Sequence, residues 1–213
     1  MVRFIFCIYF LLLNYSCGKQ KFPDYRPQGL VLRGEEEEAH RSYFKSLNPS
    51  LTGKVKGHVV MWIRELQFYT RVVIFKGPKS LRIQQYIHTG IHCPTQRDDL
   101  NHDGMIDFSE VIKSSGAILV PLDGKLGSQT SGFNWFPKSD RDGSYYYSRA
   151  ANLKWFMEDL RARDEDPNDH MIKLGQSEEL ALNRRVVILY GSASDPLLPL
   201  ACADIHAGES ILD

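Results

Sequence analysis

The sequence has no excess of charge of either sign. Its 213 residues contain 26 lysines and arginines and 26 aspartates and glutamates, which gives a formal net charge of zero. These charges are mixed along the chain, whereas a protein that binds nucleic acid needs a basic patch or stripe. We therefore predict no nucleic-acid partner.

Signatures of common enzyme classes are also missing. The chain has no Gly-x-Ser-x-Gly sequence of the kind that places a nucleophilic serine, and the segment Gly191-Ser192-Ala193-Ser194 lacks the closing glycine. It also has no glycine-rich phosphate-binding loop. We therefore expect a protein without catalytic activity.

Apolar runs long enough to span a membrane are absent as well. Phe4 to Leu13 is an apolar run of about ten residues that follows Arg3, which is the length of a signal-peptide core and too short for a membrane span. The sequence therefore predicts export, with residues 1–16 as a signal peptide.

The residues after this run resemble a bacterial lipoprotein signal, in which a small residue precedes a cysteine that is lipidated after cleavage. Here Ser16 precedes Cys17, although Asn14 and Tyr15 depart from the usual pattern. The resemblance implies a membrane anchor at Cys17 and a place in the bacterial cell envelope. Ordinary cleavage nearby, with secretion, is the alternative.

A hydrophilic tether is expected next, over residues 17–45. It contains two prolines and the acidic run Glu35 to Glu38, with few apolar residues in periodic order. The remaining residues, 46–213, are long enough for one globular domain with a full core.

Cysteine is scarce. Of the four cysteines, Cys7 lies in the signal peptide and Cys17 is the expected lipid site. In an oxidising compartment Cys93 and Cys202 then form a possible disulfide. Two free buried thiols are the alternative.

The most specific pattern in the chain runs from Asp99 to Glu110. Oxygen-bearing side chains stand at its first, third, fifth, ninth and twelfth places, and Gly104 stands at the sixth, as in the calcium loop of an EF-hand. The predicted calcium ligands are the side chains of Asp99, Asn101, Asp103, Asp107 and Glu110 and the backbone carbonyl of Met105.

Two further residues of this loop have expected roles. Gly104 allows a sharp turn with positive φ, and Ile106 at the eighth place should point into the core. His92 to Thr95, which precede the loop, do not form a helix pattern, so the paired helices of a calcium sensor are not expected. We therefore interpret the calcium ion as a structural one, with an acidic surface turn as the alternative.

The body of the chain has the period-two pattern of strands separated by glycine and proline turns. One helix is expected between Ala150 and Arg163, where apolar residues recur at helical spacing. Spaced strands of this kind predict an antiparallel β-sandwich or barrel. The expected strands are Lys54–Ile63, Gln67–Phe75, Arg82–His88, Ala117–Leu122, Ser144–Ser148 and Arg185–Tyr190.

The order of these segments resembles the copper/zinc superoxide dismutase sandwich and the related CHRD domains. The resemblance rests on Tyr86 to Gly90 followed by Cys93, and on Arg185 to Tyr190 followed by Leu198 to Cys202. It implies a mainly β, superoxide-dismutase-like Greek-key sandwich with an inserted EF-hand calcium loop and one short helix. It also implies a disulfide between Cys93 and Cys202.

The copper chemistry of that family does not carry over. Tyr86 and Tyr190 stand where the family has histidines, and Ala203 replaces a glycine, so His88 is the only copper ligand that can be placed. Copper redox cycling needs several imidazoles on one ion. The chain also resembles a group of exported bacterial proteins that carry an EF-hand loop inside a CHRD-like domain.

Two functions follow from these patterns. The first is an exported calcium-binding protein without catalytic activity, which meets an unidentified partner in the envelope or outside the cell. The alternative is a redox metalloenzyme on the same sandwich. Its ligands would come from four histidines: His58, His88, His92 and His170.

Overall fold

The computed structural model describes residues 39–126, 135–163 and 170–205. The predicted signal peptide, Cys17 and residues 18–38 of the predicted tether lie outside these ranges. Within them, no helix combines the length and apolar character needed to cross a membrane.

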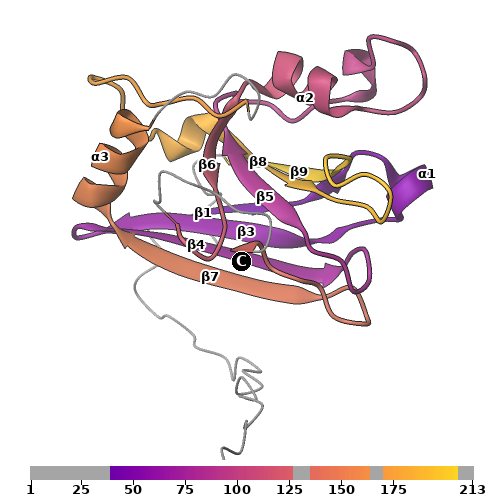
Figure 1. Ribbon diagram of the computed structural model, residues 1–213, viewed down its shortest axis with the longest axis horizontal. Coiled ribbons are helices and arrows are strands. Elements are labelled where there is room, and N and C mark those ends of the chain that lie inside the picture. The colour runs from indigo at the N-terminus through magenta and orange to yellow at the C-terminus, as the bar shows by residue number, and fades with distance from the viewer. Residues whose placement is uncertain (1–38, 127–134, 164–169, 206–213) are drawn as a thin grey trace, which may run out of the picture. The chain divides into compact units, whose positions relative to one another are not determined.

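The described chain is mainly β and forms two antiparallel sheets (Figure 1). Sheet A consists, in spatial order, of β1 (His40–Tyr43), β3 (Lys56–Arg64), β4 (Gln67–Lys76) and β7 (Tyr145–Asn152). Sheet B consists, in spatial order, of β2 (Lys45–Ser46), β9 (Pro199–Ile205), β8 (Arg185–Tyr190), β5 (Gln84–His88) and β6 (Ile118–Pro121).

Strands β3 and β4 form an antiparallel hairpin. Arg64 pairs with Gln67, and Glu65 in the turn adopts a positive φ of 55°. Residues of β4 alternate between buried and partly exposed along most of the strand, because successive side chains point to opposite faces of a sheet. The same alternation buries Tyr145 and Tyr147 of β7 and exposes Tyr146.

The largest group of buried apolar residues lies between the two sheets. We call it the inner core. Sheet A contributes Val59, Met61, Phe68 and Val72, and sheet B contributes Ile87, Leu119, Val187 and Leu189. The inner core therefore packs the two sheets against each other.

Sheet B is buried on its other face as well, since nearly every residue of β5, β6, β8 and β9 is inaccessible to solvent. A second group, the outer cluster, joins Tyr86, Ile188 and Tyr190 of this sheet to Ile106 and Val111 from the segment between β5 and β6. In Figure 1 helix α2 (Phe108–Ser115) lies on this side of sheet B. The predicted calcium segment thus covers the outer face of sheet B.

The prediction of a single helix is wrong, because a second helix, α2, begins at Phe108 within the predicted calcium loop. Asp107 and Glu110 form a capping box at its start, in which each side chain accepts the other's backbone N–H. The expected helix is present as α3 (Leu153–Ala162), but strand β7 continues to Asn152, whose side chain caps α3. A short helix α1 (Pro49–Thr52) and two 3-10 turns, η1 (Gln96–Asp98) and η3 (Leu182–Arg184), complete the elements.

The strands begin earlier than the predicted domain start at residue 46. Strand β1 pairs with β3, as in the pair His40 and Met61, and the two-residue β2 pairs with β9. Both lie within residues 17–45 or at their boundary. Strands of four and two residues are too short to give a period-two signal in the sequence.

Candidate metal centre

The segment from Asp99 to Gly104 folds back on its own side chains. Asp99 accepts the N–H of Asp103 (3.2 Å) through Oδ1 and that of Gly104 (2.9 Å) through Oδ2. Gly104 has a φ of +83°, a conformation that a side chain would strain, so the predicted role of this glycine is confirmed. Asn101 Oδ1 also accepts the N–H of Asp103 (2.9 Å).

Glu110 closes the segment from the other end. Its Oε1 accepts the N–H of Leu100 at 2.7 Å and that of Asn101 at 3.2 Å, while Oε2 accepts the N–H of Asp107 at 2.9 Å. The twelfth residue of the pattern therefore lies against the second, third and ninth. Residues 99–110 form a closed loop, which we call the acidic loop.

The hydrogen bonds at the start of α2 also affect the charge of Asp107. Partial burial acts to raise the pKa of this carboxyl, but the N–H of Glu110 and the hydroxyl and N–H of Ser109 outweigh it, and Lys113 adds a favourable charge. The pKa of Asp107 is therefore held below its ordinary value. The group is ionised at neutral and mildly acidic pH.

Two carboxylates of the acidic loop are buried. Asp99 is 7% exposed and Glu110 is 2% exposed, and within the described ranges no lysine, arginine or histidine forms a salt bridge with either. Buried charges in proteins are ordinarily paired or bind metal. Backbone N–H groups alone compensate these two.

The acidic loop does not bring its carboxylates together as a ready-made cluster. Among the described residues, no three histidine, cysteine, aspartate or glutamate side chains are grouped as metal ligands. Several of the oxygens instead accept a single N–H, as Asp103 Oδ1 does from Met105 at 2.8 Å. A carboxylate has about four lone-pair sites, so these oxygens keep capacity for a cation.

The eighth residue of the acidic loop is fixed from outside by Asn48. Asn48 Oδ1 accepts the N–H of Ile106 at 2.9 Å, and its Nδ2 donates to the carbonyl of Ile106 at 2.8 Å and to that of Pro199 at 2.9 Å. Asn48 is 3% exposed and Ile106 is 1% exposed. The predicted inward direction of Ile106 is confirmed, and one amide side chain satisfies both backbone groups of this residue.

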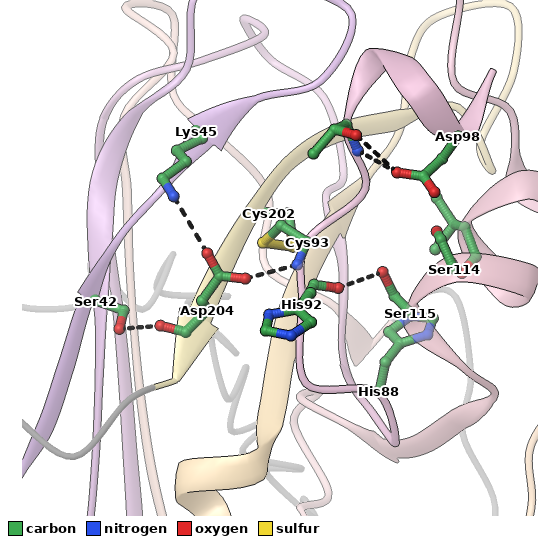
Figure 2. Close-up of a disulfide and its surroundings, with 12 residues drawn as sticks. Ser42, Lys45, His88, His92, Cys93, Asp98, Ser114, Ser115, Cys202 and Asp204 are labelled. Atoms are coloured by element: carbon green, nitrogen blue, oxygen red, sulfur yellow. Dashed lines mark hydrogen bonds and ion pairs between the residues drawn. A yellow bond between two sulfur atoms is a disulfide. The ribbon is translucent and has the colours of Figure 1, made fainter.

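A disulfide joins the segment before the acidic loop to the last strand. Cys93 and Cys202 are bonded across a sequence separation of 109 residues, with their Cα atoms 5.7 Å apart (Figure 2). This confirms the predicted bridge. It connects the segment between β5 and the acidic loop to β9.

Asp204 reinforces the same connection. Figure 2 shows its carboxylate between Lys45 and Cys93: Oδ1 accepts the N–H of Cys93 at 2.6 Å, and Oδ2 lies 3.2 Å from Lys45 Nζ. Ser42 of β1 donates to the backbone carbonyl of Asp204. The residues around the disulfide therefore hold β1, β9 and the segment before the acidic loop together.

His88 has no lone pair left for a metal ion. Its Nδ1 lies 2.8 Å from the carbonyl of Gly116, which can only accept, so Nδ1 carries the hydrogen. Its Nε2 then accepts the hydroxyl of Tyr190 at 2.9 Å. Complete burial lowers the pKa of His88 to about 4, against the smaller opposing effect of the Gly116 hydrogen bond. His88 is a neutral core residue.

The other three histidines of the predicted metalloenzyme are in separate surroundings. His58 lies between Tyr43 and Phe75 on sheet A. His92 is exposed beside the disulfide, and its carbonyl accepts the hydroxyl of Ser115. His170 contacts Phe108. The structure does not combine these side chains with His88 into a site.

Asn48 is the important residue that sequence reasoning missed. It is 58 residues from Ile106 in the sequence and belongs to no local motif with the acidic loop. The only local signal is an asparagine before Pro49 at the start of α1, a position typical of a helix cap, but the side chain makes no capping hydrogen bond.

Comparison with known proteins does not assign the chain to a family. No protein-family model matches the chain, and no curated protein is significantly similar to it. The likeness to superoxide dismutase and CHRD domains therefore stays a prediction from the sequence.

Proposed function

We propose that this chain is an exported calcium-binding protein without catalytic activity, and that its acidic loop holds one structural Ca²⁺ ion. The single observation that carries this proposal is the burial of Asp99 and Glu110 in a closed loop, with backbone N–H groups and no cationic side chain as their partners in the described chain.

The chemistry of the loop supports calcium rather than a softer metal. Six oxygen donors are available, from Asp99, Asn101, Asp103, Asp107, Glu110 and the carbonyl of Met105. Oxygen-only ligand sets of this size suit Ca²⁺, whereas zinc and copper sites use imidazole or thiolate ligands. The cysteines nearby are in a disulfide, and His88 has both nitrogens engaged.

A structural role follows from where the acidic loop is attached. Ile106 packs into the outer cluster, and full burial of an isoleucine side chain stabilises a protein by about 1.5–3 kcal/mol. An ion that rigidifies the acidic loop would stabilise its packing against the outer face of sheet B. We assign the protein to the superoxide-dismutase and CHRD type of Greek-key sandwich, with the copper ligands replaced by Tyr86 and Tyr190.

The compartment belongs to the same proposal. We infer export on the basis of the N-terminal signal pattern, with a lipid at Cys17 that anchors the domain in a bacterial envelope, or secretion if Cys17 is not lipidated. A disulfide is consistent with an oxidising compartment. The partner that the domain meets there is unidentified.

Elemental analysis combined with thermal melting tests the proposal. We expect close to one calcium per chain and no stoichiometric copper or zinc. At a free calcium concentration about 100 times the Kd, binding adds about 2.7 kcal/mol of stability. For a domain of this size that raises the Tm by about 5–10 °C.

Two variants make the test specific to the acidic loop. Glu110→Gln should abolish the calcium-dependent rise in Tm, whereas Glu158→Gln, on an exposed part of α3, should leave it intact. A Tm that does not respond to calcium would disprove the structural ion. Stoichiometric copper or zinc would instead favour the metalloenzyme.

A further inference from the structure

Sheet A concentrates positive charge in a protein whose net charge is zero. Its four strands contain six lysines and arginines and no aspartate or glutamate: Arg41, Lys56, Arg64, Arg71, Lys76 and Arg149. The acidic residues of the described chain lie in other segments. The fold thus separates charges that are mixed in the sequence.

The outer face of sheet A, opposite the inner core, is ordered in rows across the strands. Cross-strand pairing aligns Tyr43, His58, Val73 and Tyr146 in one row. The next row contains Arg41, Val60, Arg71 and Ser148, and a third contains Trp62, Tyr69 and Ala150. The face therefore carries an arginine row between two aromatic rows, and we call it the basic face.

Arg71 sits at the centre of this face, and no acidic side chain within the described ranges forms a salt bridge with it. Its guanidinium carbon lies 5.6 Å from the ring centroid of Trp62 and 6.0 Å from that of Tyr146, which are cation–π distances. Its buried Nε has no hydrogen-bond partner in the part of the chain that the structure describes. A buried N–H of this kind calls for an acceptor, and the sheet provides none.

Two further observations show that the basic face is electropositive. Lys56 and Lys76 are cross-strand partners, and like charges in that position destabilise a sheet. The pKa of His58 is lowered by burial and then by the positive charges of Arg41 and Arg71. An anion at this face would relieve both effects.

The aromatic side chains on the basic face point to a broad partner. Trp62 and Tyr69 stack on each other, with centroids 5.0 Å apart and planes at 4°, so their facing sides are not free for a sugar or a base. Tyr43, Phe75 and Tyr146 are 68%, 61% and 51% exposed and lie at the same end of the sheet. None of the labelled helices covers this face in Figure 1.

We propose that the basic face docks on an anionic lipid bilayer. Tyrosine side chains favour the membrane–water interface, phenylalanine is typical of the apolar face of surface-bound elements, and arginine and lysine bind acidic headgroups. Sheet A is also the first part of the domain after Cys17: residues 18–39, which span at most about 80 Å when fully extended, lead into its edge strand β1. That last argument rests on the lipid anchor proposed above, whereas the charge and exposure arguments do not.

Vesicle sedimentation of the predicted mature chain, residues 17–213, carrying Cys17→Ser tests this surface without the lipid and without the apolar signal segment. Binding is measured in EGTA to phosphatidylcholine vesicles and to equimolar phosphatidylcholine–phosphatidylglycerol vesicles. We expect at least about tenfold tighter binding to the anionic vesicles, weakening as salt rises. Because calcium is absent, a failure of the calcium proposal would not affect this result.

Three double variants locate the contact. Arg41→Glu with Arg71→Glu should remove the preference for anionic vesicles, and Phe75→Ser with Tyr146→Ser should weaken binding several-fold. Lys173→Glu with Arg184→Glu, which changes two exposed basic residues outside sheet A, should have no such effect. Each variant is first checked for an unchanged circular dichroism spectrum and melting curve.

Two outcomes would overturn the proposal. A preference for anionic vesicles that persists in the Arg41 and Arg71 double variant would place the contact elsewhere. Binding to soluble dextran sulfate that matches vesicle binding, with no loss in the Phe75 and Tyr146 double variant, would mean that the basic face recognises a soluble polyanion rather than a bilayer.

Discussion

Replacing Asn48 by alanine should destabilise the fold more than any substitution of an exposed acidic-loop residue. The change leaves three backbone groups without their partner: the N–H and carbonyl of Ile106 and the carbonyl of Pro199. Asn48 and Ile106 are 3% and 1% exposed, so water replaces the lost hydrogen bonds poorly.

The expected magnitude follows from counting these groups. An unsatisfied buried polar group costs about 1–3 kcal/mol. At the low end of that range, three groups give a loss of about 3 kcal/mol in the free energy of unfolding. For a domain of this size the Tm should then fall by about 6–12 °C.

Urea denaturation in EGTA, followed by circular dichroism, measures this loss without any contribution from calcium. Asn101→Ala is the matched control, because the Asn101 amide lies on the exposed part of the acidic loop and should change the unfolding free energy by less than about 1 kcal/mol in EGTA. With calcium present the loss in Asn101→Ala should grow, since Asn101 is a predicted ligand and Asn48 is not. An Asn48→Ala protein within about 1 kcal/mol of wild type in EGTA would refute the reasoning.

Three other perturbations have defined outcomes. Replacing Cys93 and Cys202 by serine should lower the unfolding free energy by about 4–5 kcal/mol in the chain-entropy model, for a sequence separation of 109 residues; equal urea midpoints would contradict it. In the folded state His88 has a pKa of about 4, below its ordinary 6.5. As the pH is lowered, the unfolded chain therefore takes up a proton at this histidine before the folded protein does. The free energy of unfolding should fall by up to about 3 kcal/mol between pH 6.5 and 4. His88→Gln should remove that part of the pH dependence, whatever its effect at pH 7. Gly104→Ala should lower the free energy of unfolding by about 1 kcal/mol, because φ is +83° at this position. Calorimetric titration of this variant with calcium should show weaker binding than in the wild type.

The features that sequence could predict depend on local spacing. Apolar residues at helical spacing predicted α3, and the loop pattern predicted the positive φ of Gly104 and the inward side chain of Ile106. Each of these properties is set by residues a few positions away in the chain. Local spacing was therefore enough.

The missed features depend on contacts across the fold or on one residue having two roles. Asp107 and Glu110 were interpreted only as calcium ligands, although the same two side chains cap helix α2. The Asn48 contact and the basic face arise only when distant strands are aligned. The concentration of basic residues on sheet A cannot be seen in a sequence whose total charge is zero.

The attachment of the acidic loop to the last strand sets an order of assembly. Asn48 binds the carbonyl of Pro199 at the start of β9, and Cys93 is joined to Cys202 in the same strand. A chain made from its N-terminus produces residues 99–110 long before residues 199–205. The segment before the acidic loop can be joined to β9 only after residues 199–205 have been synthesised and an oxidant has reached Cys93 and Cys202, so a chain cut before β9 would lose both the Pro199 hydrogen bond and the disulfide.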